Sequence, residues 1–286
     1  MIDLHTHSTF SDGSLTPTQL VLEARTAGIE YLALTDHDTG KGLDEFIAAC
    51  KENGIYPVPG VEFSVFEDPV TKQQMHILGL FLDHHHPDLT SFEALMKTKR
   101  RERAFQIIDH LESDGYRFSD EQKEQLTRLN TISRAHLAKM MIQNNYIHSV
   151  DEAFDRFFGV GKPYFLPKPQ FSPEYIIGLI HNLGGLAMLA HPVYLNCNSY
   201  SELKSIIQDL KRSGLDGVEV YYPKTPKSMI HQLLTWCDEL DLLISGGSDF
   251  HGKDIRPEIA LGKGTGHLYI PNILIDQMQK RLHQNK

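Results

Sequence analysis

The chain has 286 residues, of which 41% are hydrophobic and 23% charged, a composition typical of globular proteins with a substantial core. Its net charge of −9 argues against binding duplex DNA through a broad basic surface, and no apolar run approaches the ~18 residues that span a membrane. The three cysteines are too few and too scattered for a disulfide framework, and no basic segment followed by an apolar stretch opens the chain. We therefore expect a cytoplasmic protein.

The first section of the chain alternates between strand-like and helix-like stretches. These fall at 2–4, 16–28, 31–38, 41–53, 58–66 and 75–82. The first helix carries three boundary signals, with Thr16 as N-cap, Pro17 in the first turn and Gly28 as the stop. The last two strands are joined by too few residues for a parallel crossover, which predicts a hairpin.

The middle section, 84–165, shows only helical patterns and reads as an insertion. Its helices are expected at 89–114, 119–129, 132–145 and 149–158. Afterwards the alternation resumes, with helices at 172–183, 199–213 and 225–240, strands at 185–192, 217–223 and 242–252, and a closing "LYIP" stretch before a terminal helix. This order predicts an α/β fold with a mostly parallel sheet, either barrel or open. Residues 1–83 and 166–286 would form one domain and 84–165 a helical cap.

Polar clusters end four of the predicted strands. They are "HTH" (5–7), "TDHD" (35–38), "AHP" (190–192) and "GGSDFHG" (246–252). Catalytic groups collect at the carboxyl ends of strands in barrels and open α/β sheets. His5 and His7 are two residues apart on a strand and therefore point to the same face, toward which Asp12 can swing from a Ser-Asp-Gly turn. This pattern favours a metal site.

Glu62 and His76 provide a geometric test of the same site. A hairpin turn centred near residue 70 would make them diagonal neighbours, ~7–8 Å apart at the backbone. The candidate ligands are then His5, His7, Asp12, His37, Glu62, His76, His191, Asp249 and His251. Nine imidazole and carboxylate ligands without a thiolate suit two or three divalent ions bridged by a carboxylate, with manganese, iron and zinc all compatible.

These motifs resemble those of the polymerase-and-histidinol-phosphatase (PHP) family of metal-dependent phosphoesterases. The matching stretches are "DLHTHSTFSDGS", "LALTDHD", "GVEFS", "HILG", "LAHP" and "GGSDFHG". The resemblance implies a distorted, TIM-like (β/α)7 barrel and a trinuclear centre, with Mn²⁺ as the first choice of metal. In it, His5, His7 and Asp249 hold one ion, Asp12, His37 and His251 a second, and His76 and His191 a third, with Glu62 bridging the first and third.

Within that family the chain is most similar to small enzymes with a helical insertion that act on 3′,5′-nucleoside bisphosphates and short RNA ends. The expected reaction is in-line attack of a metal-bound hydroxide on a phosphate ester, with no separate protein nucleophile. A small nucleotide or short oligoribonucleotide is the expected substrate. Arg134 and Lys162 in the insertion are candidate phosphate contacts, and ordinary surface cations are the competing interpretation.

Two other functions compete with this hypothesis. One is a phosphatase for a small metabolite such as histidinol phosphate, for which a helical cap is less expected. The other is a metal-binding, non-catalytic module, which predicts lost ligands or a fused polymerase. The triplet His84, His85 and His86 is interpreted as a loop at the insertion boundary, and no feature of the sequence marks an oligomer interface.

Overall fold

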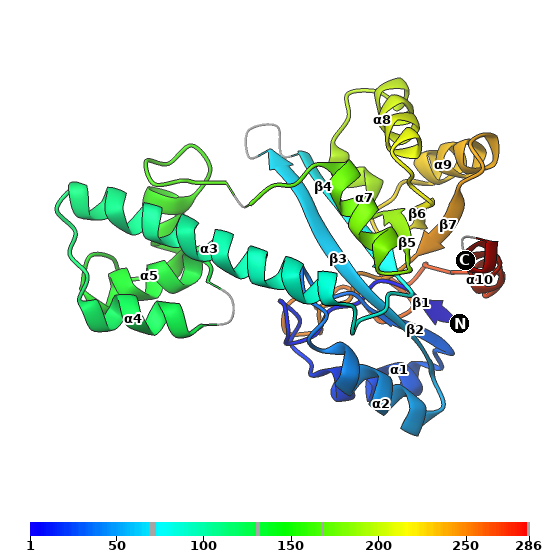
Figure 1. Ribbon diagram of the computed structural model, residues 1–286, viewed down its shortest axis with the longest axis horizontal. Helices are drawn as coiled ribbons and strands as arrows, with labels where there is room; N and C mark the ends of the chain where they lie inside the picture. Colours follow the sequence, from blue (N-terminus) through cyan, green and yellow to red (C-terminus); the bar gives the residue numbers. More distant parts are fainter. Residues whose placement is uncertain (69–72, 130–131, 168, 285–286) are drawn as a thin grey trace. The chain divides into compact units, whose positions relative to one another are not determined.

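The computed structural model describes residues 1–68, 73–129, 132–167 and 169–284 (Figure 1). The chain forms two compact units. The first contains Met1–Phe66, Gln74–Thr90 and Phe171–Lys286, and the second contains Glu67–Gln73 and Ser91–Gln170. Among the described residues, none of the helices is both long and apolar enough to cross a membrane.

The sheet has seven strands in the order of the chain. They are β1 (Ile2–Asp3), β2 (Tyr31–Leu34), β3 (Tyr56–Asp68), β4 (Gln73–Leu80), β5 (Leu186–Leu189), β6 (Gly217–Tyr221) and β7 (Leu243–Gly246). β1, β2 and β3 run parallel, as do β5, β6 and β7, whereas β4 is antiparallel to β5. This antiparallel strand distorts the barrel. β3 and β4 are neighbours as expected, and the turn predicted near residue 70 lies outside the described residues.

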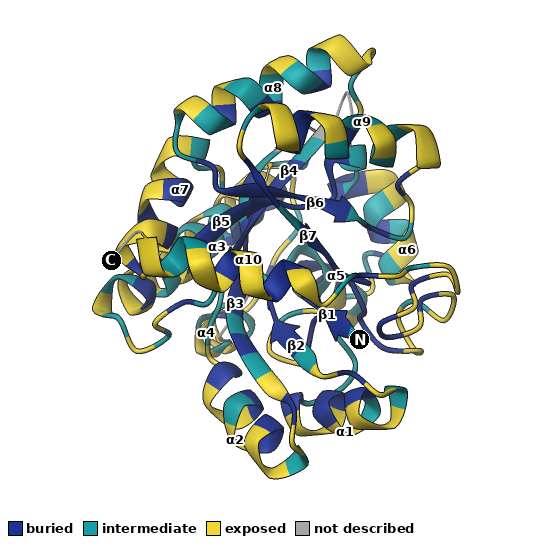
Figure 2. Ribbon diagram, turned by 90° about the vertical axis from the view of Figure 1, so that its right-hand side faces the viewer, coloured by how far each residue is buried: buried dark blue, intermediate teal, exposed yellow. Residues whose placement is uncertain are grey.

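The two outer strands, β1 and β7, approach each other and nearly close the barrel. The amide of Leu4 donates to the carbonyl of Gly246 at 3.2 Å, and Thr6 forms a parallel bridge with Phe250. The strands are largely buried, whereas the helices around them carry exposed residues on their outer faces (Figure 2). The predicted barrel fold is therefore confirmed, and its closure brings together the segments that follow β1 and β7.

In the part of the chain that the structure describes, six α-helices lie in the first unit. They are α1 (Pro17–Ala27), α2 (Leu43–Asn53), α7 (Pro173–Asn182), α8 (Tyr200–Arg212), α9 (Lys227–Glu239) and α10 (Ile273–Gln284), and a 3-10 turn covers Pro192–Leu195. The predicted boundaries of α1 are confirmed. The Thr16 side chain accepts from the amide of Gln19, and Gly28 ends the helix at φ 75°. By contrast, "LYIP" (268–271) forms no strand; Ile270 is buried in the core and Tyr269 faces solvent.

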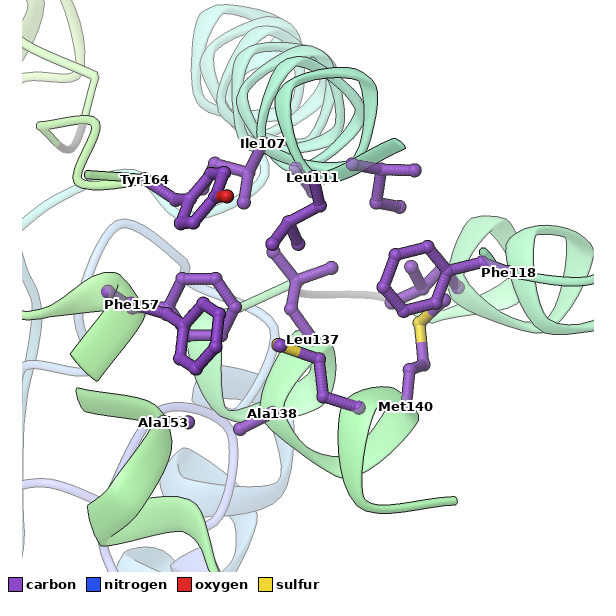
Figure 3. Close-up of a cluster of buried hydrophobic side chains, with 14 of the residues drawn as sticks. Ile107, Leu111, Phe118, Leu137, Ala138, Met140, Ala153, Phe157 and Tyr164 are labelled. Carbon is purple, nitrogen blue, oxygen red and sulfur yellow. The ribbon is translucent and has the colours of Figure 1, made fainter. Parts of the chain in front are cut away.

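All the regular secondary structure in the described part of the insertion is helical. Its elements are α3 (Pro87–Ser113), α4 (Asp120–Arg128), α5 (Arg134–Gln143), α6 (Val150–Ala153) and a π-helix (Phe154–Phe158). The helix expected at 149–158 is split because the amide of Gly159 bonds five residues back, to Phe154, at 2.8 Å. Leu111, Leu137 and Phe157 contribute to its apolar core, and the Tyr164 ring stacks on Phe157 (Figure 3).

Candidate metal centre

The nine predicted ligands meet at one end of the barrel. They come from the loop after β1 (His5, His7, Asp12), from β3 (Glu62) and β4 (His76), and from the segments after β2 (His37), β5 (His191) and β7 (Asp249, His251). Seven are buried, His37 is half-buried and Asp12 is exposed. The carboxyl ends of the parallel strands and the middle of two long strands thus supply a single cluster.

Glu62 lies at the centre of this cluster. Its Oε1 lies 2.7 Å from Nδ1 of His76 and 2.8 Å from Nε2 of His191. Its Oε2 lies 3.2 Å from Nε2 of His5, 3.2 Å from Nε2 of His7 and 3.1 Å from Nδ1 of His37. Each carboxylate oxygen therefore faces a different set of imidazoles, which is the geometry that a bridging ligand needs.

The remaining acidic ligands face the histidines from the other side. Oδ1 of Asp249 lies 3.2 Å from Nε2 of His7, and Oδ1 of Asp12 lies 3.2 Å from Nε2 of His251. Ligand atoms within 4.8 Å of one another form three overlapping groups: His5, His7, Glu62 and Asp249; His7, Asp12, His37 and His251; and His37, Glu62 and His76. The first group contains all three residues expected at the first ion, and the second group contains all three residues expected at the second ion. His191 and His76 both contact Oε1 of Glu62.

The cluster leaves several buried polar atoms without a hydrogen bond. They are Nε2 of His5, His7 and His251, Nδ1 of His37 and His191, and Oε2 of Glu62. Buried polar atoms in folded proteins are almost always hydrogen-bonded, and leaving one unsatisfied costs about 1–3 kcal/mol. All six atoms belong to predicted ligands, and five of them, all but Nδ1 of His191, come from residues whose ligand atoms form the overlapping groups. The donor set therefore fits divalent metal ions, which would satisfy these atoms at once.

The electrostatics of the cluster also suit cations. Burial lowers the pKa of His37 to about 3, so its imidazole is neutral and available for coordination. Burial would raise the pKa of Glu62, but the surrounding histidines hold it well below its usual range. Burial has the opposite effect on a histidine and would lower the pKa of His7, but the carboxylates of Asp249 and Glu62 raise it to about 9. The buried carboxylates thus draw positive charge into the site, as protons or as metal ions.

A fully buried carboxylate that the sequence reasoning missed supports two of the ligands. Oε1 of Glu219, on β6, lies 3.0 Å from Nδ1 of His5, and its Oε2 accepts from the amide of His191 at 2.7 Å. Because Nδ1 of His5 is engaged in this way, its Nε2 is directed into the cluster. The available signal was a glutamate within the apolar strand "GVEVY", since an acidic residue is rarely buried without a partner.

Two further missed residues hold Asp249. Nη1 of Arg256 lies 2.5 Å from its Oδ2, and the hydroxyl of Tyr222 donates to the same atom at 3.0 Å. The other oxygen, Oδ1, is therefore the one that faces His5 and His7. Neither residue had a sequence signal, because each lies in a loop or strand end without a recognisable motif.

The two acidic residues that flank His37 have structural partners of their own. Asp36 accepts from both the amide and the hydroxyl of Ser8, at 2.7 and 2.6 Å. Asp38 does the same for Ser64, at 2.8 and 3.0 Å. Asp36 thereby fixes the loop that carries the first two histidines, so its role is to position that loop.

The backbone around the site is tightly constrained. A Cβ on Gly247 would lie 2.2 Å from Cβ of His5, so only glycine fits where β7 passes behind this ligand. Asp249 and His191 adopt positive φ angles of 55° and 27°. Such conformations cost about 1–3 kcal/mol each and persist where the surrounding structure imposes them, commonly at functional sites.

The two candidate phosphate contacts lie in the second unit, whereas all nine ligand candidates lie in the first. Arg134 opens α5, where its Nη1 donates to the carbonyl of Phe158 at 2.8 Å and its guanidinium lies over the rings of Phe154 and Phe165. Lys162 is exposed in the turn that follows the π-helix. Arg134 therefore has a structural role in the insertion, while the Lys162 ammonium faces solvent.

Comparison with known proteins agrees with this picture. The model of the PHP domain family matches residues 3–212. A 5′-3′ exoribonuclease of Haemophilus influenzae is 38% identical over 249 residues, which cover 87% of this chain and 89% of that protein. A 3′,5′-nucleoside bisphosphate phosphatase of Chromobacterium violaceum is 33% identical, over 89% of this chain and 90% of that protein.

Among solved structures, an amidohydrolase from Chromobacterium violaceum with bound sulfate and no metal superposes with a TM-score of 0.71. It is 30% identical, and the match covers 98% of this chain and 96% of that one. The chain belongs to the PHP family. Its relatives include phosphatases and exoribonucleases, which hydrolyse phosphate esters, so the predicted family and hydrolase class are confirmed.

Proposed function

We propose that this protein is a metal-dependent phosphoesterase that removes phosphate from 3′,5′-nucleoside bisphosphates, or acts at the 5′ ends of short RNAs. The observation that carries the proposal is the position of Glu62, whose two oxygens face two different sets of histidines. The names of the two relatives that match most of the chain support the same substrate classes.

The nine clustered side chains are the proposed metal ligands, in the trinuclear arrangement expected from the family. Manganese is the first candidate metal, and iron and zinc suit the same ligands. When bound, such ions polarise the phosphoryl oxygens and lower the pKa of a water so that it can act as nucleophile at neutral pH. The three overlapping groups of potential ligand atoms and the unsatisfied buried atoms of the predicted ligands support this assignment.

The chain's own residues have the task of holding these ligands and admitting the substrate. Glu219 orients His5, while Arg256 and Tyr222 orient Asp249. The side chain of Asp12 is 56% exposed and that of His37 24%, whereas the other seven ligands are buried. The phosphate ester is therefore proposed to enter on the side of Asp12 and His37.

Arg134 and Lys162 are proposed to contact the phosphates of the substrate. An ammonium in a Gly-flanked turn suits a phosphate as a point charge, and a guanidinium suits it as a bidentate donor. Lys162 is the better supported of the two, because its side chain is exposed, whereas the Arg134 guanidinium already donates to the carbonyl of Phe158.

A cytoplasmic location is proposed as well, because Cys50 and Cys237 are buried free thiols, and burial raises the pKa of each to about 12.

The proposal is tested by phosphate release from adenosine 3′,5′-bisphosphate and from histidinol phosphate, at equal concentration, with Mn²⁺ and with a chelated control. We expect rapid, chelator-sensitive turnover of the bisphosphate and little release from histidinol phosphate. Release from histidinol phosphate alone would overturn the nucleotide assignment while keeping the metal centre. Release from neither, with bound metal, would favour a non-catalytic metal-binding module.

A further inference from the structure

A second group of metal-ligand side chains lies apart from the nine residues of the proposed centre. Asp44 is in the first turn of α2, and His84 and His85 form the turn between β4 and α3. Nε2 of His84 lies 3.0 Å from Oδ1 of Asp44, and Nε2 of His85 lies 3.4 Å from the same oxygen. All three potential ligand atoms lie within 4.8 Å of one another.

These distances match those between ligands of a small divalent ion. Zinc–nitrogen and zinc–oxygen bonds of ~2.0–2.2 Å in tetrahedral geometry place neighbouring donor atoms about 3.3 Å apart. The centroids of the two imidazole rings lie 4.0 Å apart, and each ring directs its Nε2 atom toward Oδ1 of Asp44. One divalent cation placed between these three atoms can therefore interact with both rings and the carboxylate.

The backbone on which the two histidines stand is already fixed. The amide of Asp83 donates to the carbonyl of Leu183 at 2.8 Å, and the amide of His85 donates to the Asp83 carboxylate at 3.1 Å. The amide of His86 donates to the carbonyl of Asp83 at 3.1 Å. A ligand would therefore meet an ordered turn, which lowers the entropy cost of binding.

We propose that Asp44, His84 and His85 form a second, peripheral site for a divalent transition-metal ion such as Zn²⁺ or Ni²⁺. Two imidazole nitrogens with one carboxylate select these ions over Mg²⁺ and Ca²⁺, which prefer oxygen ligands. The side chains of Asp44 and His85 are 74% and 70% exposed, so water completes the coordination. The bound ion links α2 to the turn that leads into α3. This proposal stands independently of the proposed enzymatic activity.

The test compares Ni²⁺ binding to the metal-depleted full-length chain in wild type, His85→Ala and Asp44→Asn, measured by equilibrium dialysis. The matched control is His231→Ala, which removes an exposed imidazole from α9 of the same unit. We expect wild type and the control to bind one more Ni²⁺ per chain than His85→Ala. We also expect Asp44→Asn to bind that ion at least about tenfold more weakly, because the negative charge is lost.

Thermal unfolding and activity provide two further measurements. Saturating Ni²⁺ should raise the Tm of wild type by about 2–4 °C more than that of His85→Ala, since the ion binds the folded chain. Phosphate release with Mn²⁺ should be the same for both proteins. Equal Ni²⁺ stoichiometry in wild type and His85→Ala would overturn the proposal. So would a loss of Mn²⁺-dependent activity in that variant, because the missing ion would then belong to the main centre.

Discussion

Oε1 of Glu219 lies 3.0 Å from Nδ1 of His5, and both side chains are completely buried. A carboxylate in this position increases the basicity of a ligating imidazole and fixes its orientation. We expect Glu219→Gln to lower metal affinity and activity about 10–100-fold, which is the usual cost of losing such a partner. The check is the Mn²⁺ concentration needed for half-maximal phosphate release, with Glu239→Gln on the exposed face of α9 as the matched control. An unchanged half-maximal concentration would contradict this role.

Glu62 offers both of its oxygens to the cluster, so its replacement tests the bridge directly. Glu62→Gln keeps the shape of the side chain but turns one oxygen into an NH₂ group, which cannot ligate a cation. We expect activity to fall by more than roughly 100-fold, beyond the cost of losing a supporting residue. The far-UV circular dichroism should stay close to wild type, which shows that the variant folds. Near-normal turnover by a correctly folded variant would disprove the bridging role.

Gly247 tests how closely β7 must pass behind His5. A Cβ at this position would lie 2.2 Å from Cβ of His5 and 2.5 Å from its backbone nitrogen, so the backbone has to shift. We expect Gly247→Ala to lower the free energy of unfolding by about 1–3 kcal/mol and to reduce activity, because the first ligand moves. The matched control is Gly178→Ala in α7, where a Cβ meets nothing within 4 Å. That variant should gain about 0.5–1 kcal/mol from its higher helix propensity. Urea unfolding measures both, and equal stabilities would refute the steric argument.

The hydrogen bond between His181 and Asp216 makes stability depend on pH. It raises the pKa of His181 above its usual 6.5, although the side chain is 38% exposed and solvent screening keeps the effect small. A histidine with a raised pKa stabilises the fold fully below its unfolded pKa, and this contribution is lost as the pH rises through the folded pKa.

The stability difference between wild type and His181→Gln should therefore be larger at a pH of about 6 than at about 8.5. Asp216→Asn should remove this pH dependence, because the charge that favours the imidazolium is gone. Urea unfolding at the two pH values is the measurement. A difference of the same size at both values would show that the hydrogen bond does not depend on protonation.

Of the two proposed phosphate contacts, Lys162 gives the clearer test, because Arg134 also donates a hydrogen bond within the insertion. We expect Lys162→Ala to raise the KM for adenosine 3′,5′-bisphosphate about 10-fold, corresponding to one lost charge-assisted hydrogen bond. Lys139→Ala, an exposed lysine on α5, is the control for the loss of one positive charge from the insertion. Equal KM values for the two variants would contradict a phosphate contact and show that Lys162 is an ordinary surface cation.

Local signals in the sequence were sufficient for the helix boundaries and for most ligand candidates. Thr16 and Gly28 mark the ends of α1 through contacts within a few residues. His5 and His7 were recognisable because alternate residues of an extended segment point to the same face. The strand itself is shorter than expected, since β1 ends at Asp3 and both histidines lie in the segment that follows it. One expectation failed for a local reason: a π-helix replaces the end of the helix expected at 149–158.

The tertiary structure alone decided which distant residues meet. Glu219 and His5 are 214 residues apart, and Arg256 reaches Asp249 only because the loop after β7 folds back on itself. The register that places His76 against Glu62, and the direction of β4 in the sheet, also depend on strand pairing and barrel closure. The sequence by itself thus determined the ligand types and the ends of elements, because propensities and caps act over a few residues. Packing determined how the ligands are held, because that depends on contacts between segments far apart in the chain.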